Sequence, residues 1–329
     1  MSLLFSPLTL RSVTLPNRIA VSPMCQYSAT DGIPNDWHFV HLGSRAVGGA
    51  GLVIAEATAV EPRGRISAQD VGIWNDEQVE AWKRITTFIK EHGAVPGVQL
   101  AHAGRKAFGD WVPVAPTTEP FPGLNTPEKL TNHTEIVKAF VAGALRAIEA
   151  GFEVLEIHAA HGYLLHEFYS PLTDEGSIEE RIAVPVEVTA AVRAAVGPEV
   201  PVIVRISGSD WVEGGWTADD SVVLAQALKA AGADLIDVSS GGNTAQAEIP
   251  IGPGYQVPLA EAVRRKADVP TGAVGLITEA AQAEQVLTDG SADLVLLARE
   301  LLRDPYWPLR AAQQLGVEVK APRQYARAF

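Results

Sequence analysis

The chain has 329 residues, of which 47% are hydrophobic and seven are tryptophan, enough for a large core. Its 26 basic and 39 acidic residues give a net charge of −13, which argues against nucleic acids and anionic membrane surfaces as partners. A single cysteine excludes an internal disulfide, no apolar run approaches the roughly 20 residues that span a bilayer, and the amino terminus lacks a secretory signal. We therefore expect a cytoplasmic enzyme.

The predicted elements begin with a short segment and a first strand. Residues 3–16 are mixed in character, with prolines at 7 and 16, and predict a small hairpin or cap that is a candidate lid. Residues 17–27 predict an alternating strand that ends in polar, reactive side chains. Seven further segments repeat this pattern of an apolar strand followed by polar residues: 51–57, 94–102, 152–158, 200–206, 234–239, 271–275 and 293–298.

Helical patterns lie between most of these strands. Residues 77–92 place Val79, Trp82, Ile85 and Ile89 on one face. Eight strands that alternate with helices predict an α/β fold, a TIM (β/α)8 barrel with a short N-terminal cap, as a single domain over residues 1–329. A doubly wound sheet is disfavoured because no G-x-G-x-x-G turn follows the first strand. The other predicted helices cover residues 135–150, about 219–231, 278–289 and 300–314.

The fourth predicted strand ends in His158, His161 and Tyr163. Because the carboxyl ends of barrel strands share one mouth, this cluster predicts an active site. Three interpretations stay open from these residues alone. The histidines could bind a metal with His102 or an acidic residue. They could be satisfied core side chains. They could also donate hydrogen bonds to a carbonyl or nitro oxygen, with Tyr163 as the proton donor.

Two arginines also fall at the predicted strand ends. Arg205 lies in an otherwise apolar strand, so a carboxylate or an electron-rich ligand atom must face it. Arg299 and Gly275 follow the eighth and seventh strands, where barrels often bind phosphate. Arg299 could instead pair with Glu300 or Asp304. A phosphate site implies a phosphorylated cofactor or substrate.

Several motifs in order along the chain carry a family resemblance. Together they resemble the old yellow enzyme family, and Cys25 with the short chain resembles its thermophilic-like ene-reductase subclass. The similarity extends from about residue 3 to the carboxyl terminus. The motifs are Ser22-Pro-Met-Cys-Gln-Tyr27, Gln99-Leu-Ala-His-Ala-Gly-Arg-Lys106, His158-Ala-Ala-His-Gly-Tyr-Leu-Leu-His-Glu-Phe168, Val204-Arg-Ile-Ser207 and Arg299-Glu-Leu-Leu-Arg-Asp-Pro305.

The resemblance implies an FMN-containing, NAD(P)H-dependent barrel enzyme that reduces activated C=C bonds of α,β-unsaturated carbonyl or nitro compounds. His158 and His161 would bind the substrate oxygen, hydride would leave flavin N5, and Tyr163 would protonate the α-carbon; Tyr27 would help to bind substrate. Arg327 matches an arginine that can reach a neighbouring subunit's site, which implies a homodimer or a higher even-numbered oligomer. No metal ligand is implied. The implied flavin contacts are Ser22, Pro23, Met24, Cys25, Ala57, Gln99, Arg205, Gly275, Ala298 and Arg299.

The sequence departs from the family pattern at three places. The segments after Leu172 and after Lys106 are shorter than usual, and Ala298 stands where a glycine is usual. Shorter segments at the mouth predict a wider, more exposed site. Two alternative functions stay open: a flavin-binding barrel whose catalysis is impaired by these trimmed segments, and a metal-dependent barrel hydrolase that uses His102, His158 and His161.

Overall fold

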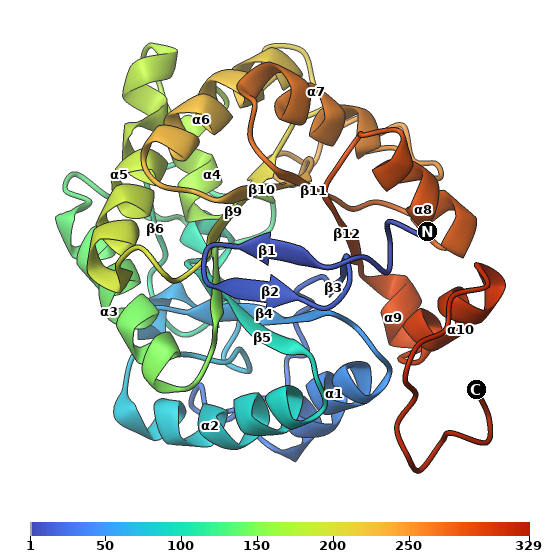
Figure 1. The fold of residues 1–329 in the computed structure, drawn as a ribbon. Coiled ribbons are helices and arrows are strands. Elements are labelled where there is room, and N and C mark those ends of the chain that lie inside the picture. Colours follow the sequence, from blue (N-terminus) through green and yellow to red (C-terminus); the bar gives the residue numbers. More distant parts are fainter. Residues whose placement is uncertain (1) are drawn as a thin grey trace.

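The computed structural model describes residues 2–329 and confirms the predicted TIM barrel. Eight parallel strands close into a ring in the order β10-β11-β12-β3-β4-β5-β8-β9, and helices surround it (Figure 1). The strands are β3 (Ile19–Val21), β4 (Leu52–Ala59), β5 (Val95–Ala101), β8 (Val154–Ala159), β9 (Val202–Ser207), β10 (Leu235–Ser239), β11 (Thr271–Ala273) and β12 (Leu294–Leu297).

The predicted amphipathic helices also form. In α2 the four apolar side chains of the predicted face are all buried, and Asn75 caps the first turn by accepting a hydrogen bond from the Gln78 backbone. The predicted helix over 300–314 is two helices, because Pro305 has no backbone N–H and interrupts it. The helices are α1 (Asp36–Val47), α2 (Asp76–Glu91), α3 (Thr134–Glu149), α4 (Leu164–Tyr169), α5 (Ile178–Val196), α6 (Ala218–Ala230), α7 (Val257–Ala267), α8 (Ala280–Thr288), α9 (Arg299–Arg303) and α10 (Trp307–Gln314).

The first strand is shorter than predicted. Residues 17–27 contribute only Ile19–Val21 to the barrel, and the chain after Ser22 leaves the ladder. Pro23 cannot donate a ladder hydrogen bond, which accounts for this early end. Residues 22–28 are therefore free to run across the mouth as an irregular segment.

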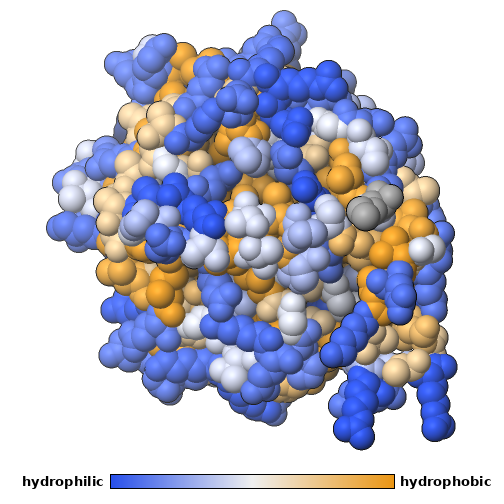
Figure 2. Space-filling view, in the orientation of Figure 1, coloured by the Kyte–Doolittle hydropathy of each residue, from blue (hydrophilic) through white to orange (hydrophobic). Residues whose placement is uncertain are grey.

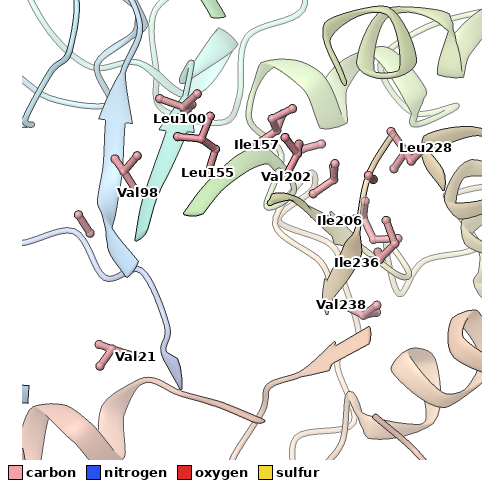
Figure 3. Packing of buried hydrophobic residues seen from close by; sticks show 14 of the residues in the cluster. Val21, Val98, Leu100, Leu155, Ile157, Val202, Ile206, Leu228, Ile236 and Val238 are labelled. Carbon is pink, nitrogen blue, oxygen red and sulfur yellow. The ribbon is translucent and has the colours of Figure 1, made fainter. Parts of the chain in front are cut away.

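Two hydrophobic layers hold the barrel together. Outward-facing strand residues such as Leu155 and Ile236 pack toward the helices, where they meet side chains such as Leu228 of α6 (Figure 3). A second, smaller cluster fills the interior toward the amino ends of the strands, and includes Leu52, Val154 and Leu294. Alternate strand residues thus divide between an outer and an inner core.

The amino-terminal segment forms an antiparallel hairpin, β1 (Leu8–Leu10) with β2 (Val13–Leu15). It lies across the centre of the barrel, inside the ring of helices, in Figure 1, and Leu10 and Leu15 join the inner cluster. Ser12 donates backbone and side-chain hydrogen bonds to Glu199, which precedes β9. The hairpin therefore closes the amino end of the barrel, and the prediction that it is a lid is wrong, since the mouth lies at the opposite end.

The face that carries this hairpin is mainly hydrophilic, with small apolar areas between (Figure 2). Among residues 2–329, no helix combines the length and the apolar character needed to cross a bilayer. A second small sheet, β6 (Val114–Ala115) with β7 (Glu128–Lys129), follows β5.

Candidate functional site

The structure brings the predicted cluster together where β8 ends. The ring of His158 lies 5.2 Å from that of His161 and 5.1 Å from that of Tyr163, measured between centroids. His161 has a positive φ of 62°, and Gly162 follows with 73°. This left-handed turn reverses the chain between β8 and α4, so that three side chains from six residues converge.

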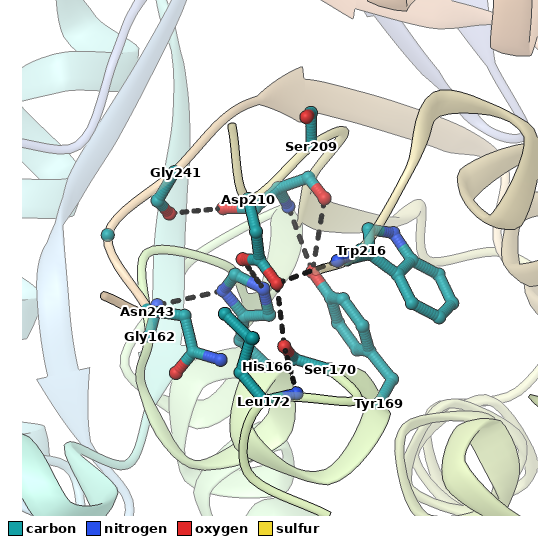
Figure 4. A network of polar contacts seen from close by, with 12 residues as sticks. Gly162, His166, Tyr169, Ser170, Leu172, Ser209, Asp210, Trp216, Gly241 and Asn243 are labelled. Carbon is teal, nitrogen blue, oxygen red and sulfur yellow. Dashed lines mark hydrogen bonds and ion pairs between the residues drawn. The ribbon is translucent and has the colours of Figure 1, made fainter. Parts of the chain in front are cut away.

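A buried polar network holds that turn in place (Figure 4). The Gly162 backbone N–H donates to His166 Nδ1 at 2.8 Å, and His166 Nε2 lies 3.0 Å from Asp210 Oδ1. Ser170 donates to the other Asp210 oxygen at 2.6 Å. Because His166 and Asp210 are fully buried and are bonded to neighbouring elements, the network ties α4 and the turn to the segment after β9.

Burial fixes the proton on each group of the cluster. It lowers the pKa of His158 and of His161 well below the usual range, with a further contribution from the positive charge of Arg205. It raises the pKa of the Tyr163 phenol well above its usual value. At neutral pH the site therefore holds two neutral imidazoles and a protonated phenol.

The two imidazoles differ in their partners. His161 Nε2 lies 2.7 Å from Ser239 Oγ, whereas His158 Nδ1 is buried without a hydrogen-bond partner among the described residues. A buried polar atom without a partner is uncommon, so His158 is not a satisfied core residue. The hydrogen-bonding capacity of this nitrogen is unused among the described residues.

Lys106 is a nearby residue that sequence reasoning missed. Its ammonium group donates to the backbone oxygens of His161 at 2.8 Å and Gly242 at 2.9 Å, and lies 5.0 Å from the Tyr163 ring centroid. Burial lowers the pKa of Lys106 to about 8. Its position just after β5, in the same motif as Gln99, could have indicated that Lys106 lies at the mouth of the barrel.

Cys25 and Tyr27 lie on the irregular segment that crosses the mouth. Burial raises the pKa of the Cys25 thiol, so it stays protonated. Tyr27 is half exposed, and burial of the rest raises its pKa to about 12. Cys25 and Tyr163 also pack against an apolar cluster that contains Ala57.

A cavity of about 230 Å³ opens beside this cluster. It collects six of the predicted flavin contacts and His161, whereas Met24, Cys25, Ala57 and Gln99 do not line it. Tyr255, Gln256 and Thr278 line it too and were not predicted, because no local pattern sets them apart. The six predicted residues are Ser22, Pro23, Arg205, Gly275, Ala298 and Arg299.

The far end of this cavity fits a phosphate group. Glu300 pairs with Arg303 and Asp304 pairs with Arg310, so both alternative partners considered for Arg299 are engaged elsewhere. No ion pair to Arg299 is found within residues 2–329, and its side chain lines the cavity. Gly275 has a φ of 122°, and a Cβ atom there would lie 2.9 Å from Gln256 Nε2. A glycine is thus required, and an unpaired cation faces the space beside it.

Arg205 is a further charged residue that lines the cavity, besides Arg299 and the Glu300–Arg303 pair. Its Nε lies 3.1 Å from Asp237 Oδ2, deeper in the barrel, while the side chain lines the cavity. Gln99 lies nearby and donates to Glu156 at 2.7 Å. A buried guanidinium with one carboxylate contact can also face an electron-rich ligand edge, so the residues present fit a flavin phosphate at one end and a flavin ring edge at the other.

The metal interpretation lacks a third ligand. His102 is bonded to Glu61 at 2.9 Å and accepts the Gly104 backbone N–H at 3.1 Å, away from His158 and His161. Across residues 2–329, no group of three or more His, Cys, Asp or Glu side chains is placed to hold a metal. Arg327 is exposed on the carboxyl-terminal tail, which packs through Tyr325 against Tyr306, so its predicted role in a neighbouring subunit stays a prediction.

Comparisons with known proteins identify the family of the chain. Residues 3–318 match the NADH:flavin oxidoreductase / NADH oxidase family. The chain is 50% identical to the NADPH dehydrogenase of Geobacillus sp. (strain WCH70), over 100% of this chain and 99% of that protein. It is 49% identical to the NADPH dehydrogenase of Listeria innocua serovar 6a, over 100% of both chains. Morphinone reductase superposes with a TM-score of 0.83 at 29% identity, covering 98% of this chain and 91% of that one.

The protein thus belongs to the NADH:flavin oxidoreductase / NADH oxidase family, as an old yellow enzyme type of FMN-dependent, NAD(P)H-dependent oxidoreductase.

Proposed function

We propose that this protein is an ene-reductase, which uses reduced FMN to saturate the activated C=C bond of an α,β-unsaturated carbonyl or nitro compound. Bound FMN supplies two-electron chemistry, accepting a hydride equivalent from NAD(P)H and passing it to the alkene. The residues assigned to hold FMN are Ser22, Pro23, Met24, Cys25, Ala57, Gln99, Arg205, Gly275, Ala298 and Arg299.

One observation carries this proposal: the neutral His158 ring lies 5.2 Å from the neutral His161 ring and 5.1 Å from the protonated Tyr163 ring, beside the cavity that Arg205 and Arg299 line. His158 has an unpartnered ring nitrogen, and His161 needs only to exchange its Ser239 contact. These groups suit an uncharged substrate oxygen that gains negative charge as the alkene is reduced.

Each side chain has a distinct role in this mechanism. His158 and His161 donate hydrogen bonds to the substrate oxygen, and these bonds strengthen as negative charge develops there. Tyr163 then delivers the proton to the α-carbon, because its raised pKa keeps it protonated at neutral pH. Tyr27, which is half exposed on the segment across the mouth, contacts the rest of the substrate.

The proposal extends to the assembly. The chain works as one FMN-binding barrel domain, and Arg327 on the exposed tail contributes to the substrate site of a neighbouring subunit in a homodimer or larger even-numbered oligomer. Phe108 and Val112, on the shortened segment after Lys106, are 51% and 60% exposed, which favours a broad substrate range.

The visible spectrum of the anaerobic protein tests the reaction. NADPH should bleach the flavin absorption, and 2-cyclohexenone should restore it. A protein that bleaches but does not recover with the enone would be a flavin-binding barrel with impaired catalysis, and the ene-reductase proposal would be wrong.

Tyr163→Phe tests the proton donor. The variant should slow reoxidation by the enone by about 10² to 10⁴-fold, because the general acid is lost, and leave reduction by NADPH within twofold. Stopped-flow absorbance measures both half-reactions separately. Tyr255→Phe is the matched control, since Tyr255 lines the cavity away from the histidine cluster. Full alkene activity in Tyr163→Phe would reassign the proton donor.

A further inference from the structure

Two carboxyl groups lie inside the barrel beneath the site and have no role in the reaction as described so far. Glu156 on β8 and Asp237 on β10 are both 0% exposed. In a strand, residues two apart face the same way, and these two precede His158 and Ser239 by two positions. The pair therefore forms the layer directly below the mouth, above the inner apolar cluster.

The hydrogen bonds of this pair are incomplete if both groups are ionised. Glu156 Oε2 accepts from Gln99, whereas Glu156 Oε1 and Asp237 Oδ1 have no partner among the described residues, and Asp237 Oδ2 has only its ion-pair contact with Arg205. The two carboxyl groups belong to the same buried layer, and the negative charge of Asp237 contributes to the raised pKa of Glu156. Two adjacent buried carboxylates cannot both stay charged, and one proton between them turns two acceptors into a donor and an acceptor. Burial raises the pKa of both Glu156 and Asp237, which favours the protonated form of each.

Among residues 2–329, Arg205 is the one charged side chain of opposite sign that contacts the pair. Arg205 on β9 lies 3.1 Å from Asp237, and Gln99 on β5 contributes a neutral amide. His158, one layer above, is neutral because burial lowers its pKa. Glu56 on β4 is turned away and accepts from the Gln26 backbone instead. The other strands present apolar side chains to the interior: Ala20, Ile54, Val274 and Leu296.

We propose that Glu156 and Asp237 act as a proton acceptor coupled to the flavin through Arg205, holding one proton when FMN is oxidised and binding a second when it is reduced. This rests on the proposed placement of the flavin edge against Arg205. With one proton on the pair, Arg205 and the pair together are neutral. Reduction places a negative charge on the cavity side of Arg205, and a second proton on the carboxyl side restores neutrality in a region that water cannot screen.

The proton balance makes this step measurable. NADPH leaves as NADP⁺ after giving up a hydride, so two electrons and one proton equivalent reach the flavin without any proton from water. The second proton of the pair must then come from solvent. Reduction by NADPH should therefore take up one proton per FMN. Glu156 and Asp237 are positioning residues, because they act through Arg205 and do not touch the substrate.

The experiment mixes the FMN-loaded protein with one equivalent of NADPH, anaerobically, in weak buffer with a pH indicator at pH 8. Wild type should take up close to one proton per FMN. Glu156→Gln should take up none, because its amide can still accept from Gln99 and donate to Asp237, while the remaining carboxylate stays paired with Arg205. Glu284→Gln is the control: this carboxylate binds the amino-terminal segment far from the mouth, and its variant should behave as wild type.

A second readout follows from equilibrium. Each proton taken up with two electrons contributes about 29.6 mV per pH unit to the slope of the flavin midpoint potential. Wild type should show twice the slope of Glu156→Gln between pH 7.5 and 9. The absorption spectrum of the reduced protein over the same pH range separates this from protonation of the flavin ring. A proton on the ring would change that spectrum in both proteins.

Three outcomes separate the possibilities. Reduction of wild type without proton uptake would overturn this inference and leave the proposed function intact. Equal uptake in wild type and Glu156→Gln would also overturn it. Failure of NADPH to bleach the flavin at all would instead contradict the proposed function. If Glu156→Gln does not retain FMN, the wild-type protein alone tests the inference, through the number of protons taken up per FMN and the pH slope of its midpoint potential.

Discussion

The two ends of the barrel use the same residue types differently. At the amino end, Arg193 donates to the backbone oxygens of Gly232, Gly197 and Val200 and pairs with Asp234 at 2.6 Å. At the carboxyl end, Arg205 makes one carboxylate contact and Arg299 makes none among the described residues. Histidines and carboxyl groups at that end are also buried with unpaired atoms.

The difference separates what holds the fold from what binds a ligand. At the amino end, each of the three guanidinium nitrogens of Arg193 has an acceptor within the protein, so this side chain contributes to stability. At the carboxyl end the charges of Arg205 and Arg299 face a cavity, which is a cost to the folded protein without a ligand. Substitutions at the two ends should therefore change different quantities.

The largest expected effect is on cofactor binding. Arg205→Met should weaken FMN binding at least about 100-fold, because removing a buried charge that faces the ligand costs several kcal/mol. Fluorescence titration of the apoprotein with FMN measures this. Arg193→Met, the matched change at the amino end, should lower the unfolding midpoint and leave the FMN dissociation constant unchanged. Similar FMN affinities in the two variants would break the comparison.

Truncation at the amino end should affect stability alone. Leu15 is fully buried where the hairpin meets the inner cluster. Leu15→Ala should lower the free energy of unfolding by about 3 kcal/mol, through lost burial and a cavity. Urea denaturation measures this, and Leu145→Ala, at a half-exposed helical position, is the control. Loss of FMN affinity in folded Leu15→Ala would show that the two ends are coupled.

At the carboxyl end, a buried carboxyl group should also make the free energy of unfolding depend on pH. Glu167 on α4 accepts from the Arg105 backbone at 2.9 Å, and burial raises its pKa to about 8. Between about pH 4.5 and 8 the folded protein holds this proton and the unfolded chain does not, so this group's contribution to stability falls as pH rises through that window.

Glu167→Gln should remove that contribution. From pH 5 to pH 8 wild type should lose on the order of 2 kcal/mol more unfolding free energy than the variant. Urea denaturation at both pH values measures the difference, with the exposed Glu80→Gln as the control. Equal losses in wild type and Glu167→Gln would mean that this carboxyl group is ionised in the folded protein.

The sequence predicted the barrel well because hydrophobic periodicity and the order of elements depend on local pattern. It predicted His158, Arg205 and Arg299 because each follows or interrupts an apolar strand. The hairpin's position could not be predicted, because which end it covers depends on packing between distant segments. Glu156 and Asp237 were missed, although their spacing of two from His158 and Ser239 was a usable signal. Gln256 and Tyr255 carry no such signal.

The smallest expected effect concerns Ala298, where the family resemblance implied a glycine. Ala298 lines the cavity just before Arg299, and its φ of −106° and ψ of −96° lie outside the main regions of backbone conformation that L-residues adopt. Ala298→Gly should change the FMN dissociation constant less than threefold and leave stability within about 1 kcal/mol, because glycine relieves backbone strain at this position while it adds freedom to the unfolded chain. Titration and urea denaturation measure the two quantities. FMN binding tightened tenfold would mean that the methyl group obstructs the phosphate, and that the carboxyl end of this chain is shaped for weaker cofactor retention than its relatives.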